Sequence, residues 1–160
     1  MLTNNKLKNL IRDFIPLKYQ VPLKYYYSKV RSYLEPEMEL LKYLVNSDDV
    51  VVDIGANRGI YTYALWRLGT KVEVFEPNPL CSNILESWGY NKFNINIHTV
   101  GLSNSFDSVN LNIPIDDNGI EHDASASVNS INFKQSRKTL IRLKTLDSYH
   151  FQLKHHLDYL

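Results

Sequence analysis

Acidic and small residues at the ends of two apolar stretches carry the clearest chemical signal in this sequence. The run 50–54 leads into a turn whose key residues are Asp53, Gly55, Asn57 and Gly59. A second run, 71–75, ends directly before Glu76, which lies 21 residues after Gly55. In open α/β sheets the first strand-to-helix turn approaches an adenosine-containing ligand, and an acid about 20 residues further on reaches the ribose hydroxyls. The two segments therefore predict neighbouring parallel strands with a nucleoside-binding edge.

The composition of the turn discriminates between adenosine cofactors. A dinucleotide fingerprint, Gly-x-Gly-x-x-Gly, lets the backbone approach a pyrophosphate at a helix N-terminus. At those three positions this chain has Gly55, Asn57 and Ile60, so two of the glycines are missing. Asp53 instead brings a carboxylate that would repel a phosphate and attract an ammonium group. S-adenosylmethionine carries an ammonium and no phosphate, so the turn favours it over a nicotinamide dinucleotide.

Four motifs together resemble the FkbM-type family of S-adenosylmethionine-dependent methyltransferases. They are Asp53-Ile54-Gly55-Ala56-Asn57-Arg58-Gly59-Ile60-Tyr61-Thr62, Phe75-Glu76-Pro77-Asn78-Pro79, Val100-Gly101-Leu102-Ser103 and Lys144-Thr145-Leu146-Asp147. The resemblance runs from about Glu35 to about Asp147. It implies an α/β, Rossmann-like class I methyltransferase sheet with helices on both faces. It also implies S-adenosyl-L-methionine as cofactor and methyl transfer to a hydroxyl group of a sugar, glycan or related small molecule.

Seven residues are candidates for binding the cofactor: Asp53, Gly55, Asn57, Gly59, Glu76, Asn78 and Gly101. We expect Asp53 to attract the methionine ammonium, directly or through water, and Glu76 to accept hydrogen bonds from both ribose hydroxyls. The glycines and Asn57 tolerate left-handed backbone, and Gly101 follows the third strand, where an adenine ring would lie. The structural alternatives are a plain strand-to-helix turn, a surface acid and, at Asn78, a helix cap. Tyr61 and Thr62 could likewise flank the cofactor or lie on a helix surface.

Transfer of a methyl group to a hydroxyl requires alignment of the reactants and a base for the hydroxyl proton. His122 and Asp123, in the polar segment 116–125, are candidate bases, with exposed loop residues as the structural alternative. His98 and His150 are less favoured. The terminal group of His155, His156 and Asp158 lacks the converging ligands of a closed metal site, so no metal is predicted.

Hydrophobic periodicity places these motifs on alternating strands and helices. The expected parallel strands are 50–54, 71–75 and 94–100, and the expected helices are 36–45, 59–68 and 79–89. After Gly101 the pattern changes, since segments 107–113 and 138–144 alternate apolar and polar residues. These two segments predict strands of a β-rich insertion.

Composition is that of a globular domain, with 160 residues, 44% of them hydrophobic and 22% charged. A net charge of +1 gives no reason to expect nucleic acid, and the single cysteine, Cys81, excludes an intrachain disulfide. Charged residues near the N-terminus interrupt any apolar run, so neither a signal peptide nor a membrane span is predicted there, and cytoplasmic residence is the expectation.

The charge is unevenly distributed, which suggests a division at residue 34. Residues 1–34 contain seven Lys or Arg residues against one Asp, and five tyrosines, and form a basic N-terminal arm ahead of the cofactor-binding domain, 35–160. The arm could contact an anionic membrane surface or an acidic glycan, or it could simply cover the domain. Pro16 and Pro22 are expected to interrupt helical periodicity, which favours the covering role.

The end of the sequence leaves two alternatives to an active methyltransferase. In the family it resembles, a fourth strand leads into an Asp-Val-Glu-Gly-type segment, which this sequence lacks. We therefore expect the N-terminal, incomplete part of a methyltransferase domain, truncated after the third strand and the β-rich insertion. A non-catalytic S-adenosylmethionine-binding fragment is the first alternative, and a nicotinamide-dependent oxidoreductase is the less favoured second one.

Overall fold

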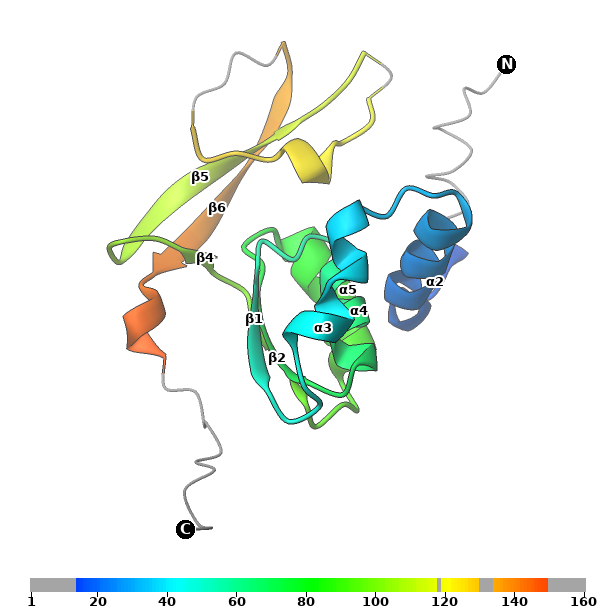
Figure 1. The fold of residues 1–160 in the computed structure, drawn as a ribbon. Helices are drawn as coiled ribbons and strands as arrows, with labels where there is room; N and C mark the ends of the chain where they lie inside the picture. The colour runs from blue at the N-terminus through cyan, green and yellow to red at the C-terminus, as the bar shows by residue number, and fades with distance from the viewer. Residues whose placement is uncertain (1–13, 118, 130–133, 150–160) are drawn as a thin grey trace.

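A three-stranded parallel sheet forms the centre of the computed structural model, which describes residues 14–117, 119–129 and 134–149 (Figure 1). The strands β1 (Val50–Ile54), β2 (Lys71–Phe75) and β3 (Ile95–His98) lie in the order β1-β2-β3. The helix α4 (Ile60–Arg67) connects the first two strands, and α5 (Pro79–Gly89) connects β2 to β3. The three strands and these two helices confirm the elements expected from the sequence, with bounds that differ by up to two residues.

The described α-helices cover one face of this sheet, whereas the family resemblance predicted helices on both faces (Figure 1). Both crossover connections advance in the same direction, from β1 to β2 to β3. Because such connections are right-handed, α4 and α5 must lie on the same side of the sheet. Among the described strands, β1 pairs only with β2, and its Val52 and Ile54 are 36% and 60% exposed.

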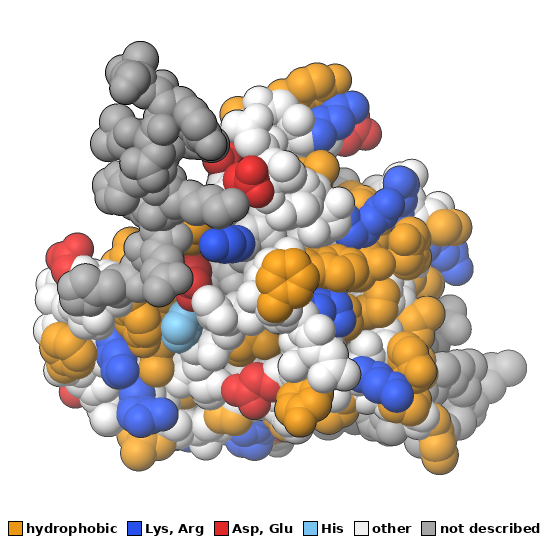
Figure 2. All heavy atoms as spheres, turned by 90° about the horizontal axis from the view of Figure 1, so that it is seen from below, with side chains coloured by type: hydrophobic (Ala, Val, Ile, Leu, Met, Phe, Trp, Pro, Cys, Tyr) orange, Lys and Arg blue, Asp and Glu red, His pale blue; other side chains and the backbone are white. Residues whose placement is uncertain are grey.

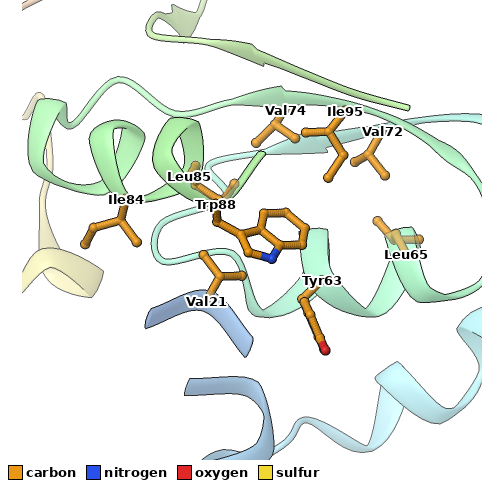
Figure 3. Close-up of a cluster of buried hydrophobic side chains, with 10 residues drawn as sticks. Val21, Tyr63, Leu65, Val72, Val74, Ile84, Leu85, Trp88 and Ile95 are labelled. Carbon is orange, nitrogen blue, oxygen red and sulfur yellow. The ribbon is translucent and has the colours of Figure 1, made fainter. Parts of the chain in front are cut away.

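The hydrophobic core lies between the sheet and these helices (Figure 3). Val72 and Val74 of β2 are 1% and 0% exposed and face the helices. Tyr63 of α4 packs against Trp66 and Trp88, with ring centroids 5.7 Å apart in each case. The aliphatic strand residues and the aromatic helix residues thus fix the positions of the two loops that follow β1 and β2.

The helix α2 (Leu17–Val30) is continuous through Pro22, so the expected interruption of helical periodicity is wrong. Pro16 occupies the N-cap position, where its missing N–H is no loss, but Pro22 removes one hydrogen bond inside the helix. Tertiary packing compensates, because Val21 is 0% exposed and lies against Gly59 and Leu85. Through this contact α2 packs on α4 and α5 and becomes part of the domain core.

The segment before β1 is also less regular than expected. In place of one helix over 36–45, the chain forms the 3-10 helix η1 (Pro36–Glu39) followed by the short α3 (Leu41–Leu44). Leu41 and Val45 pack against the core, but Leu40 and Leu44 are 53% and 71% exposed, so tertiary packing covers too little of the segment to stabilise a longer helix.

A second sheet follows the parallel one and corresponds to the expected β-rich insertion (Figure 1). The strands β4 (Gly101–Leu102), β5 (Asp107–Pro114) and β6 (Ser136–Lys144) lie in the order β4-β6-β5. Between β5 and β6 the chain forms the 3-10 helix η2 (Asp123–Ser125), and η3 (Leu146–Ser148) follows β6. Leu111, Ile113 and Ile141 form a small core of their own.

The surface near α2 and α3 mixes apolar and basic side chains. In Figure 2, hydrophobic side chains interleave with Lys and Arg on the side of the molecule that carries these two helices. Tyr43 of α3 is 76% exposed, and the Lys42 ammonium lies 4.8 Å from its ring centroid. No helix in the described part of the chain is both long enough and apolar enough to cross a membrane.

Candidate functional site

The loop between β1 and α4 is built on left-handed backbone at three positions. Gly55, Asn57 and Gly59 have φ values of 74°, 50° and 75°. A Cβ atom at Gly59 would lie 2.6 Å from Leu85 Cδ2, so the missing side chain allows α4 to pack closely against α5. At Gly55 a Cβ atom would meet nothing within 4 Å. The loop is therefore packed at its helical end and open at its strand end.

Glu76 holds this loop to the segment that follows β2. One carboxylate oxygen accepts a hydrogen bond from the backbone N–H of Asn57 at 2.6 Å, and the other accepts one from the N–H of Asn78 at 2.7 Å. The residue is only 5% exposed, and burial raises the pKa of its carboxyl group while the two N–H groups oppose that shift. Each carboxylate oxygen has two acceptor positions, so hydrogen-bonding capacity remains on both.

Asp53 lies at the neighbouring strand end and bonds to the helix that follows it. Its side chain accepts a hydrogen bond from the Thr62 hydroxyl at 2.5 Å. Burial raises the pKa of Asp53, and the hydrogen bonds from Thr62 partly offset that effect. Thr62 itself is fully buried. The Tyr61 hydroxyl, by contrast, donates to Glu35, and this hydrogen bond raises the pKa of Tyr61 to about 12.

Asn78 caps α5 and also contacts the insertion. Its side-chain oxygen accepts the Leu80 N–H at 3.1 Å, which confirms the capping alternative, and its amide nitrogen donates to Asp123 at 3.3 Å. Asp123 also receives two hydrogen bonds from Arg58, from Nη2 at 2.5 Å and from Nε at 3.0 Å. The β1–α4 loop, the start of α5 and the insertion therefore meet at one carboxylate. Arg58 was not among the residues predicted for the site, since no sequence signal pairs it with an acid 65 positions away.

The remaining predicted residues lie in different surroundings. His122 Nε2 lies 3.3 Å from an Asp116 oxygen, whereas His98 lies on the sheet face opposite the helices, bonded to Glu73 at 2.8 Å. Gly101 is buried, and a Cβ atom there would come within 2.7 Å of Leu143 and 3.6 Å of Pro77. His150, His155, His156 and Asp158 lie outside the described residues.

A cavity of about 700 Å³ adjoins the loop. It is bounded by α2, by Asn57 and Arg58, and by residues 121–125 of the insertion. His122 and Asp123 line it, while Asp53 and Glu76 do not. Within the described ranges, no group of three or more His, Cys, Asp or Glu side chains is arranged to hold a metal ion.

Comparison with known proteins identifies the family. The sequence model of one protein family, described as the methyltransferase FkbM domain, matches residues 53–160. This range includes the β1–α4 loop, Glu76 and the insertion. No curated protein matches the chain. The family match covers about two thirds of the sequence and confirms the resemblance drawn from the motifs. The chain belongs to the FkbM methyltransferase domain family and carries a methyltransferase domain.

Proposed function

We propose that this chain binds S-adenosyl-L-methionine at the β1–α4 loop and transfers its methyl group to a hydroxyl of a sugar, glycan or related small molecule. The observation that carries the proposal is the bridge from Glu76 to the backbone of Asn57. This bridge places a buried carboxylate at the strand end beside a loop whose Gly55 is open to a ligand. An acid in that position suits a pair of ribose hydroxyls.

The chemistry of the available groups fits this cofactor. Asp53 and Glu76 lie on adjacent strands, and burial raises the pKa of both carboxyl groups. A ligand ammonium near Asp53 would favour its ionised form. The Asp53 carboxylate would repel a pyrophosphate beside the loop, which argues against the nicotinamide alternative.

The cofactor supplies an activated methyl group on its sulfonium, so the protein has to align the acceptor and remove a proton. We assign the role of the base to His122, which lines the cavity beside the loop. Its Nε2 lies 3.3 Å from a carboxylate oxygen of Asp116. With Nε2–H directed at Asp116, Nδ1 accepts the hydroxyl proton. Asp123 suits a positioning role better than a base, because Arg58 donates two hydrogen bonds to one of its oxygens and Asn78 donates one to the other.

Calorimetric titration of the full chain with S-adenosylhomocysteine tests the cofactor assignment. Glu76→Gln should weaken binding about tenfold to a hundredfold, since hydrogen bonds to a charged group contribute about 1.5–3 kcal/mol. Glu86→Gln is the matched control, because Glu86 is an acid that accepts a hydrogen bond from the Thr99 hydroxyl and lies outside the loop. A melting curve for each variant verifies folding. Equal affinity in both variants, or tighter binding of NAD than of S-adenosylhomocysteine by the wild type, would overturn the proposal.

A further inference from the structure

The cavity beside the β1–α4 loop has one helical wall. Gln20, Leu23, Lys24 and Tyr27 of α2 line it, and their spacing of three and four residues places them on a single face of the helix. Leu23 and Tyr27 remain 49% and 44% exposed. The volume of about 700 Å³ is within the range of about 300–1,000 Å³ that small-molecule sites occupy.

The other two walls belong to the proposed site. Asn57 and Arg58 come from the β1–α4 loop, and Asn57 is the residue whose N–H binds Glu76. Facing them is the segment 121–125, held in place by the pairing of Asp123 with Arg58. A molecule in the cavity would therefore touch the loop assigned to the cofactor on one side and His122 on another.

The charged groups of the lining are balanced and largely paired. Lys24 and Arg58 face Glu121 and Asp123. Asp123 binds Arg58, and Glu121 accepts two hydrogen bonds from Arg137, at 2.6 and 2.9 Å. A charged ligand would have to be desolvated while competing with these pairs, which is unfavourable. The electrostatics of the lining therefore favour an uncharged ligand.

The uncharged lining groups suit a molecule with both apolar and hydroxyl surfaces. Leu23, Tyr27 and Ala124 supply apolar contact, while Gln20, Asn57 and Ser125 supply donors and acceptors. A pyranose ring presents C–H faces and a hydroxyl rim. We propose that this cavity is the acceptor subsite and takes a neutral pyranose; this inference rests on the methyl-transfer function proposed above.

Nuclear magnetic resonance titration of the full, ¹⁵N-labelled chain tests the subsite. The probes are the neutral methyl pyranosides of glucose, galactose, mannose and 6-deoxymannose, with methyl glucuronide and methyl glucosaminide as charged counterparts. We expect at least one neutral glycoside to shift the backbone amides of Leu23, Asn57 and Ser125. Leu23→Trp, which fills the cavity, should weaken that binding at least tenfold. Leu40→Trp should leave it unchanged, since Leu40 has a similar exposed fraction, 53%, but lies outside the cavity.

Three outcomes would overturn the subsite: no shift of those amides with any neutral glycoside, equal or tighter binding of a charged glycoside, or equal weakening by the two tryptophan variants. Titration with S-adenosylhomocysteine, run in parallel, separates the two proposals. Binding of S-adenosylhomocysteine without any glycoside response rejects the subsite alone. A glycoside response without S-adenosylhomocysteine binding rejects the methyl-transfer function.

Discussion

Arg58 and Asp123 are 65 positions apart in the sequence, and their side chains form an ion pair at 2.5 Å. The pair joins the loop of the parallel sheet to the insertion. Its side chains are 15% and 7% exposed, so water screens it weakly. The segment 121–125, which forms one wall of the cavity, therefore depends on a residue of the loop for its position.

A double-mutant cycle with Arg58→Ala and Asp123→Ala should reveal a coupling free energy of about 0.5–3 kcal/mol in urea unfolding. The pair of Arg137 and Glu121, which is 34% and 30% exposed, provides the comparison and should couple by about 0.2–1 kcal/mol. Hydrogen exchange at 121–125 should accelerate in both Arg58 and Asp123 variants. A coupling no larger than that of the control pair would contradict the anchoring role.

The two loop glycines should respond differently to alanine. Both have positive φ, so each substitution should lower the free energy of unfolding by about 1–2 kcal/mol. Gly59→Ala should lower it by about 1–3 kcal/mol more, because its Cβ atom would clash with the fully buried Leu85. Thermal unfolding measures the difference. Equal destabilisation would show that α5 can move away from the loop.

Stability should depend on pH through Asp53. Burial raises its pKa in the folded chain, so the folded state binds this proton more tightly than the unfolded state does. Its ionisation therefore lowers stability as the pH rises from about 4, the ordinary pKa, through the raised value. Asp53→Asn removes that loss. The melting temperature of the variant minus that of the wild type should become more positive as the pH rises from about 4 to about 8. If this difference became more negative, burial would not be the cause that dominates the pKa of Asp53.

The packing of α2 on the domain can be tested with one substitution at two sites of the same helix. Val21→Ala should lower the free energy of unfolding by about 1–3 kcal/mol, because Val21 is 0% exposed and lies beside Gly59 in the core cluster that includes Leu85. Val30→Ala should change it by less than about 0.5 kcal/mol, since Val30 is 83% exposed. Chemical unfolding of both variants provides the measurement. A change of less than about 0.5 kcal/mol in the free energy of unfolding at both positions would mean that α2 contributes little to the core.

Local patterns in the sequence were sufficient to predict the strands and helices that depend on interactions between residues close together in the chain. The apolar runs predicted β1 and β2, the Asn-Pro pair predicted the cap and start of α5, and the alternating segments predicted β5 and β6. The motifs also identified the family. These features depend on hydrophobic periodicity, on turn-forming residues and on capping, all of which act within a few residues.

Tertiary contacts decided the rest. Pro22 lies in a continuous helix because Val21 packs against α4 and α5. Local helix propensity cannot predict the stabilisation that comes from this tertiary packing. The handedness of two consecutive crossovers, rather than composition, places α4 and α5 on one face of the sheet. Asp123 binds Arg58 and Asn78 only because the insertion folds back over the loop. The sequence alone thus determined which residues have the chemistry for a cofactor site, and the tertiary structure decided their partners, since pairing over 65 positions depends on how separate elements pack.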